Sequence, residues 1–355
     1  MPQNFVMRLK NYRKGKTDMG LWYKNSDKEN PLVVSSRIRL ARNVANLPFP
    51  TRMNDSQKQE LLNSVKNILD GINIEGVGTL KYFNLESIPE EELYAMVERH
   101  TISPDFAKKS GPKGLIISED ESVSIMLLEE DHIRIQVLVG GFALETAYDT
   151  ALAIENILDR NLKIAFDSQL GYLTECPTNL GTGLRASTML HLPVLESLGA
   201  VSHLADSVAK IGLTIRGMYG EGSASKAALY QLSNQVTLGI SEKSAIENLK
   251  AITGQIVARE QNSLAEIDKS VLEDTVYRAF GTLKYARKLS GEEMMNLISQ
   301  VKLGVDAGIL KISDISLPMT LLIETAPATL QKKHGKMSPE DRDVVRAKEI
   351  RERLE

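Results

Sequence analysis

Four short stretches of the sequence bring arginine together with hydroxyl, carboxylate or thiol side chains: 35–39, 129–134, 176–185 and 216–221. The arginine guanidinium is a planar fork that stays charged and binds phosphate oxygens two at a time. Carboxylates can orient a cationic acceptor and take up its proton, and a cysteine near cationic groups tends to ionise. Phosphoryl transfer uses these residue types, because it depends on neutralised phosphate charge and aligned reactants.

Each feature also has a plainer interpretation. An isolated arginine is most often a surface residue or half of an ion pair, and the acidic run 129–131 can be a solvated turn. Cys176, the only cysteine, can be a small buried hydrophobic residue. The stretch 181–186 fits the Gly-x-Gly-x-x-Ala dinucleotide fingerprint, but it lacks a clear βαβ unit and an acidic ribose partner. The sequence contains no P-loop and no protein-kinase catalytic-loop motif, so arginines would have to hold the phosphates.

The alternation of side chains along predicted strands places these arginines on particular faces. Alternation over 33–40 predicts a strand with Arg37 and Arg39 on one face. A tight acidic turn is expected to join antiparallel strands over 122–129 and 132–139. On the second strand, polar side chains share one face: Glu130, His132, Arg134 and Gln136. Apolar side chains share the other: Ile133, Ile135 and Val137. One face of this strand can therefore line a site while the other fills a core.

The remaining pattern changes along the chain. Before residue 241, it predicts helices over 55–70, from Pro89 onward, over 144–158 and over 187–211 with a break at Pro193, and strands over 163–166, 213–216 and 229–238. After residue 241, it predicts amphipathic helices over 241–265, 268–289 and 291–303, and a last helix from Ser338. We therefore predict an α+β fold in three parts: a basic leader (1–30), a catalytic domain (31–260) and a helical C-terminal domain (261–355).

Composition excludes several classes of protein. The 355 residues carry a formal net charge of -3, which gives no global attraction to nucleic acid or to an anionic membrane. One cysteine allows neither an intramolecular disulfide nor a multi-cysteine zinc site. No apolar run approaches the roughly 18 residues of a membrane span, and the basic start lacks an apolar signal core. We expect a cytoplasmic protein that binds neither membranes nor nucleic acid directly.

The four stretches, in this order, resemble the signature segments of the guanidino (phosphagen) kinases, the ATP:guanido phosphotransferase family. The resemblance implies an antiparallel sheet flanked by helices, ATP and Mg²⁺ as cofactors, and no metal held by the protein alone. It assigns catalysis to Glu130, Glu221 and Cys176. It assigns ATP binding to Ser35, Ser36, Arg37, Ile38, Arg39, His100, Arg134, Arg185, Ala186, Ser187, Thr188, Met189, Arg216, Gly217, Met218, Tyr219, Gly220 and Glu221.

Two departures resemble the bacterial protein-arginine kinase branch (McsB type) of that family, over about 31–354. The first phosphate-binding arginine is already Arg37, which leaves no room for the N-terminal helical domain of the small-metabolite enzymes. The chain also continues beyond the catalytic unit from near Ser263, a stretch that the small-molecule kinases lack. As a further mark, the segment 342–347 resembles the branch's Arg-Asp-x-x-Arg-Ala motif. The resemblance implies an allosteric phosphoarginine pocket built from Arg342, Asp343, Arg346 and Ala347. An exposed helix held by salt bridges remains the alternative, because many charges surround this segment.

The resemblance implies a kinase that phosphorylates arginine side chains on proteins with accessible arginines. By analogy its clients pass to a Clp-type protease in stress response and protein quality control, a zinc-binding protein activates it, and it forms a homo-oligomer. Two alternatives stay open: a kinase for free arginine or another small guanidine, and a non-catalytic adaptor that binds phosphoarginine.

Overall fold

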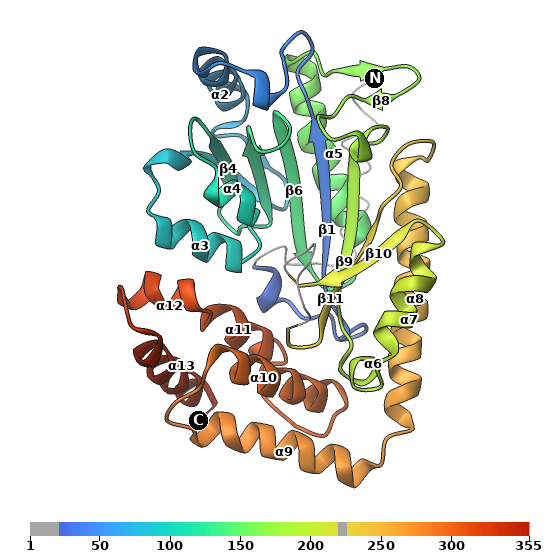
Figure 1. Cartoon of the computed structure of the whole chain (residues 1–355), viewed down its shortest axis with the longest axis vertical. Coiled ribbons are helices and arrows are strands. Elements are labelled where there is room, and N and C mark those ends of the chain that lie inside the picture. The colour runs from blue at the N-terminus through green and yellow to red at the C-terminus, as the bar shows by residue number, and fades with distance from the viewer. Residues whose placement is uncertain (1–20, 219–225, 355) are drawn as a thin grey trace.

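A nine-stranded sheet forms the centre of the structure, a computed structural model that describes residues 21–218 and 226–354 (Figure 1). Every pair of neighbouring strands is antiparallel. In spatial order the strands are β10 (Leu213–Gly217), β11 (Leu229–Asn234), β9 (Leu184–His191), β1 (Val33–Arg42), β6 (Ile133–Gly140), β5 (Val123–Leu127), β4 (Gly114–Ser118), β3 (Gly78–Asn84) and β2 (Asn73–Ile74). The pair β7 (Phe166–Asp167) and β8 (Gly171–Tyr172) stands apart.

One face of the sheet is covered by helices whose apolar sides form the main core with β1, β5 and β6. These helices are α2 (Asp55–Leu69), α5 (Leu144–Asn161), α7 (Ala200–Ala209) and α8 (Glu242–Ala265). Asn54 caps α2, since its side chain accepts from the backbone amide of Gln57 while the Gln57 side chain accepts from the backbone amide of Asn54. Ile38 and Leu40 of β1 are fully buried in this core. The opposite face of β1 is thereby left for Arg37 and Arg39.

The opposite face is covered only in part. Helices α3 (Glu90–Glu98) and α4 (Pro104–Lys108) pack over β4 and β5 through a small core that includes Leu93, Met96 and Phe106. Beyond them, the middle of the sheet stays accessible between β6 and β10. This uncovered area is where the site lies.

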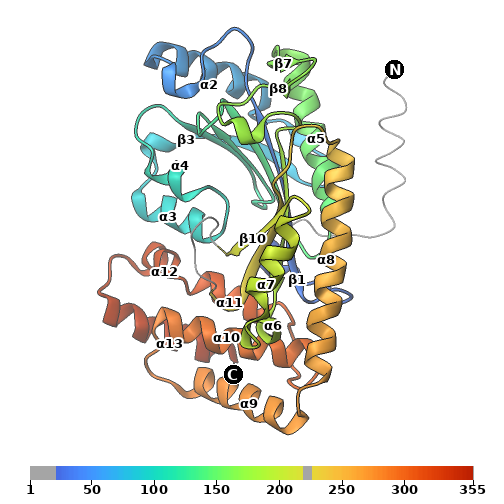
Figure 2. The same ribbon diagram turned by 45° about the vertical axis from the view of Figure 1, so that its right-hand side comes forward.

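The C-terminal helices form a separate layer below the sheet (Figures 1 and 2). They are α9 (Lys269–Tyr285), α10 (Gly291–Asp306), α11 (Leu317–Glu324), α12 (Pro327–His334) and α13 (Pro339–Leu354). Their core continues onto the lower end of the sheet through Val34, Leu138 and Met189. Helix α8 runs unbroken through the boundary that the sequence predicted at 260/261, and the chain turns between Ala265 and Lys269.

One sequence prediction needs correction, and another gains detail. Within the predicted leader 1–30, Trp22 and Tyr23 are each only 4% exposed and pack in the core of the C-terminal helices. Residues 1–20 of that leader lie outside the described part of the chain. The prediction of helix over 187–191 was wrong, because these residues continue strand β9 between β1 and β11. A short apolar run does not distinguish a buried strand from a helix, and sheet pairing decides here. Helix α6 (Pro193–Ser197) begins after this strand.

No helix in the described ranges has the length and apolar character that crossing a membrane requires.

The close contact between α9 and α10 gives a stability prediction. A Cβ at Gly304 of α10 would lie 2.2 Å from Cγ1 of Val276 on α9. Gly304→Ala is therefore expected to lower the free energy of unfolding by about 1–3 kcal/mol through overpacking. Gly281→Ala, also within a helix of this layer, meets nothing within 4 Å. It should raise that free energy by about 0.5–1 kcal/mol, because alanine favours the helix. Urea unfolding of both variants tests the pair, and equal effects would contradict the close packing.

Candidate functional site

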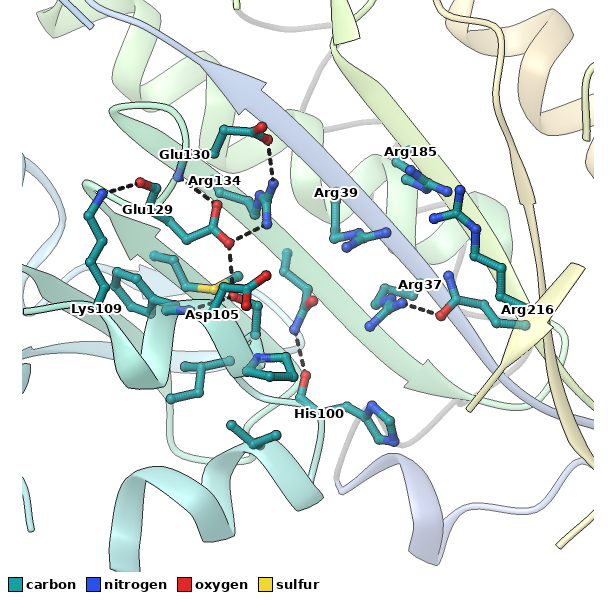
Figure 3. A pocket seen from close by; sticks show the side chains of 18 of the residues that line it. Arg37, Arg39, His100, Asp105, Lys109, Glu129, Glu130, Arg134, Arg185 and Arg216 are labelled. Atoms are coloured by element: carbon teal, nitrogen blue, oxygen red, sulfur yellow. Dashed lines mark hydrogen bonds and ion pairs between the residues drawn. The ribbon is translucent and has the colours of Figure 1, made fainter. Parts of the chain in front are cut away.

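Five arginines predicted to act together line one pocket of about 440 Å³ on the uncovered face of the sheet (Figure 3). They come from four strands: Arg37 and Arg39 from β1, Arg134 from β6, Arg185 from β9 and Arg216 from β10. Arg39 and Arg185 are direct cross-strand partners, a pairing of like charges that normally destabilises a sheet. The sheet therefore gathers cations where repulsion would otherwise separate them.

Burial and mutual repulsion both disfavour the charged forms of two of these arginines. Desolvation, together with the charges of Arg185 and Arg134, lowers the pKa of Arg37 to about 10. Desolvation and the neighbouring arginines lower the pKa of Arg39 well below its ordinary value. The Nε of Arg39 is covered by protein and has no hydrogen-bond partner among the described residues. Arg37 donates to Oε1 of Gln231 at 2.6 Å. A polyanion in the pocket would relieve this repulsion and satisfy the Arg39 donor.

Carboxylates face the arginines across the pocket (Figure 3). Arg134 forms ion pairs with Glu129 at 2.6 Å and with Glu130 at 3.2 Å. The Glu129 carboxylate also accepts from the hydroxyl of Ser103 at 2.8 Å, which fixes its position. Glu130 is less enclosed, and its carboxylate also accepts from the side-chain amide of Asn179 at 3.4 Å. Glu129 therefore holds Arg134 in place, while Glu130 retains accepting capacity toward the pocket.

Glu130 gives the site a pH dependence. Burial raises its pKa above the ordinary value of 4.5, the charges of Asp131, Glu129 and Glu175 add to that rise, and Arg134 opposes it. Because its pKa is raised, Glu130 becomes protonated at a higher pH than an ordinary glutamate. The protonated carboxyl no longer accepts the proton of the acceptor. We therefore expect initial rates of ADP release to fall on the acid side at a pH above 4.5. Circular dichroism at the same pH values separates this loss from unfolding, and an acid limb at or below 4.5 would contradict the assignment.

His100 lies at another part of the pocket, where the sequence resemblance expected a nucleotide contact. Its backbone takes a left-handed conformation with φ of 60°, which is uncommon for a residue with a side chain. Burial and the charge of Arg37 lower the pKa of its imidazole to about 3, so the ring is neutral near pH 7. A neutral ring beside the cations is suited to an uncharged part of a ligand.

The consecutive runs expected to bind ATP divide between the two faces of the sheet, because side chains alternate along a strand. Ser35, Ser187 and Met189 line a small cavity that shares Arg37 and His100 with the main pocket. The side chains of four other expected residues lie on the helix-covered face of the sheet: Ser36, Ile38, Ala186 and Thr188. Ser36 donates to the carbonyl of Gly141, and Thr188 bonds Thr253 of α8.

The other expected residues have different outcomes. Met218 lines the pocket, and Gly217 ends β10 opposite Tyr230. Cys176 is half-buried with its sulfur 3.0 Å from the hydroxyl of Thr178, and it is not among the pocket-lining residues. Three of the expected residues lie outside the described residues: Tyr219, Gly220 and Glu221. The structure therefore gathers the arginines and Glu130, and does not bring Cys176 to the pocket wall.

Sequence reasoning missed several residues that line the pocket. Glu129 stands beside Glu130 in the same acidic run, so its position was available from the sequence. Alternation along β11 places Gln231 on the pocket face, but no motif around it indicates a functional role. Asp105 and Lys109 come from the region of the short helix α4, which no sequence pattern predicted.

The Arg-Asp-x-x-Arg-Ala segment lies on α13, away from the pocket. Arg346 is 1% exposed and donates to the carbonyls of Thr325 at 3.0 Å and Leu289 at 2.8 Å, and it pairs with Asp343 at 2.6 Å. Its Nη2 points toward Gly291, where a Cβ would lie 3.9 Å away. Arg346 is therefore no member of an exposed charged helix surface. Its guanidinium ties α13 to the segments before α10 and α12.

Known proteins resemble this chain along most of its length. Residues 60–263 match the family model described as ATP:guanido phosphotransferase, C-terminal catalytic domain, and residues 269–355 match the protein-arginine kinase McsB C-terminal domain. A protein-arginine kinase of Halothermothrix orenii is 43% identical over 337 residues, or 94% of this chain and 96% of that one. Another, of Clostridium kluyveri, is 44% identical over 343 residues, or 95% and 99% of the two chains. The substrate-free duplicated taurocyamine kinase of Schistosoma mansoni superimposes with a TM-score of 0.58 at 25% identity, over 79% of this chain and 40% of that one.

Proposed function

Because the chain belongs to the ATP:guanido phosphotransferase family and is an enzyme of its protein-arginine kinase branch, we propose that it transfers the γ-phosphoryl group of ATP to arginine side chains of proteins. The observation that carries the proposal is the cluster of five arginines that shares one pocket with Glu130, in which burial lowers the pKa of Arg37 and Arg39. The cluster supports binding of a polyanion, and the carboxylate supports binding of a cationic acceptor. The two partners of the reaction have opposite charges, and so do the two sides of the pocket.

With His100 toward the rest of the nucleotide, we assign the phosphates of ATP to the five pocket arginines: Arg37, Arg39, Arg134, Arg185 and Arg216. Magnesium enters as part of the Mg-ATP substrate. The carboxylates that line the pocket fit an ion held mainly by phosphate oxygens, and the described residues gather no group of three or more metal-ligating side chains. When bound, the ion neutralises phosphate charge.

Glu130 orients the guanidinium of the acceptor and competes with water for its protons. In the reaction a bond forms between a guanidino nitrogen and the γ-phosphorus while the bond from that phosphorus to the β,γ-bridging oxygen breaks, and ADP leaves. The nitrogen loses one proton, which a carboxylate receives. Glu221, the second carboxylate that the resemblance assigns to this step, lies outside the described residues. We propose that it and Cys176 complete the acceptor side.

The test is mass spectrometry under non-acidic conditions on a disordered, arginine-containing protein treated with Mg-ATP and this chain, because N–P bonds are lost in acid. We expect phosphoarginine on the protein. Phosphate appearing only on added free arginine would instead identify a small-guanidine kinase. Absence of ATP turnover with retained binding of phosphoarginine peptides would identify an adaptor.

We also propose that α13 carries a phosphoarginine pocket that tunes activity, built from Arg342, Asp343, Arg346 and Ala347. The guanidinium of Arg346 beside Gly291 supports phosphate binding, and the half-buried carboxylate of Asp343 supports binding of the guanidino group. Arg342 bonds only weakly to the carbonyl of Met337, at 3.4 Å. Calorimetric titration with phosphoarginine tests the proposal, and equal affinity in wild type and Arg342→Ala would contradict it.

The proposed cellular role follows from family analogy. We propose that the enzyme acts in the cytoplasm during stress, that its marked clients pass to a Clp-type protease, and that a zinc-binding protein activates it. We further propose a homo-oligomer. Light scattering measures the assembly state, and degradation of a phosphorylated client by a purified Clp protease, compared with the unphosphorylated client, tests the route.

A further inference from the structure

The turn after α3 carries His100 into the pocket in a strained conformation. Arg99 and His100 follow the last residue of α3, Glu98, and His100 ends the helix with φ of 60°. A left-handed residue with a side chain costs free energy, and it persists where its surroundings determine it. The surroundings of this turn therefore set the position of the His100 ring.

Side chains from three other elements hold the carbonyls of this turn one by one. Trp22 donates from its indole nitrogen to the carbonyl of Arg99 at 2.8 Å. Gln136 of β6 donates to the carbonyl of His100 at 2.9 Å. Ser124 of β5 donates to the carbonyl of Thr101 at 2.7 Å. Two of these donors, Gln136 and Ser124, belong to the sheet. The third, Trp22, belongs to the core of the C-terminal helices.

Trp22 joins the C-terminal helices to His100. Its ring meets the imidazole edge to face, with centroids 5.5 Å apart. The same segment is attached to α11, because Thr320 donates to the carbonyl of Tyr23 at 3.4 Å and Lys24 pairs with Glu324 at 2.8 Å. A movement of α11 would therefore move the His100 turn through the side chain of Trp22.

Glu98 makes the second connection. Its carboxylate accepts from the amide of Ala328 at 2.7 Å, and from the amide and hydroxyl of Thr329 at 2.7 and 2.9 Å. These groups lie in the first turn of α12, whose own N-cap residue, Ala326, supplies no side-chain cap. Free amides at a helix start need acceptors, so Glu98 of α3 caps α12 across the junction. The residue that caps the C-terminal helix stands two positions before His100.

We propose that the C-terminal helices position the nucleotide end of the pocket through Glu98 and Trp22, which act as positioning residues for ATP binding. This inference rests on the proposed function only in placing the nucleotide at His100. Neither residue needs to touch ATP. Moving α11 or α12 shifts the His100 turn, and the affinity for ATP changes with it.

The Glu98→Gln variant tests the proposal. Glutamine offers one oxygen where two are used, and its amide group faces an amide of α12, so the cap is lost in part. We expect the KM for ATP to rise about five- to tenfold, with kcat and the KM for the protein substrate nearly unchanged. Lys336→Ala is the matched control, because it removes an exposed pair with Glu91 of α3 at 3.5 Å and should change nothing. An unchanged KM for ATP in Glu98→Gln, or a fall in kcat alone, overturns the proposal.

Tryptophan fluorescence gives a second readout that needs no acceptor, because Trp22 is the only tryptophan of the chain. ATP should change the emission of wild type, and the titration of Glu98→Gln should shift to about five- to tenfold higher ATP. If wild type and Glu98→Gln give identical titrations, the inference is wrong but the proposed kinase function stands. If folded wild type binds no ATP, the proposed function itself is wrong.

The Thr329→Val variant is the alternative if Glu98→Gln fails to fold. It removes only the hydroxyl donor to Glu98, and it should shift the titration in the same direction by a smaller amount. No shift in that variant would also count against the proposal.

Discussion

Arg39→Ala is expected to lower kcat/KM for ATP by about 10³-fold, the loss typical of removing a positive group that stabilises transferring phosphate. Arg39 pairs with Arg185 on the neighbouring strand β9, and its Nε has no hydrogen-bond partner among the described residues. Its charge is repelled by Arg37, Arg134 and Arg185, so it is placed for a ligand and contributes nothing obvious to the stability of the empty protein. The free energy of unfolding without ATP should accordingly stay equal or increase.

The measurement combines steady-state ADP release with urea unfolding of the same preparation. Arg278→Ala is the control, because Arg278 is an exposed arginine of α9 paired with Asp274 on its own helix. That variant should keep both activity and stability. An Arg39→Ala protein with activity close to wild type would refute the assignment of the pocket. A large loss of stability would show instead that Arg39 supports the fold.

Glu130→Gln is expected to lower kcat by about 10²- to 10⁴-fold while the dissociation constant of ATP stays close to that of wild type. The substitution keeps the shape of the side chain but removes the charge that attracts a guanidinium and the base that takes its proton. Arg134→Ala should differ, because Arg134 is one of the five pocket arginines that we assign to ATP and it also pairs with Glu129 and Glu130. That variant should weaken ATP binding as well as transfer.

Single-turnover phosphorylation separates the two variants when ATP binding is measured independently by fluorescence. Glu119→Gln, a change at an exposed carboxylate paired with Lys81, serves as the matched control and should behave as wild type. If Glu130→Gln and Arg134→Ala lose ATP affinity equally, Glu130 acts on the nucleotide and its assignment to the acceptor is wrong.

Local chemistry made much of the fold predictable. Two of the predicted helices begin where local residues can cap them, and the structure shows the caps at Asn54 and Ser290. The hairpin β5–β6 was also predicted correctly, because alternation and an acidic turn are visible within a dozen residues. Strand β9 and helices α11 and α12 were not identified. Their state depends on partners far away in the sequence: β1 and β11 in one case, α3 and the N-terminal segment in the other.

The site was predictable in its charges and less so in its geometry. The resemblance named the arginines of β1 and β9, and alternation alone already separates Arg37 from Ile38. The same alternation would have separated the two faces of 185–189, but only if this segment had been predicted as a strand and not as the start of a helix. Lys109 and the φ of His100 had no local signal, since both depend on how the segment after α3 packs against the sheet. The enclosed position of Arg346 likewise depends on Leu289 and Thr325, which lie in other segments.

The spread of the pocket arginines along the chain has a consequence for synthesis on the ribosome. The pocket combines Arg37 from β1 with Arg216 from β10, and β10 joins the sheet by pairing with β11, which ends at Asn234. A nascent chain cannot assemble the pocket until residue 234 has left the exit tunnel and paired. Nucleotide can therefore stabilise only chains whose sheet has already closed, because the earlier nascent chain lacks a complete pocket.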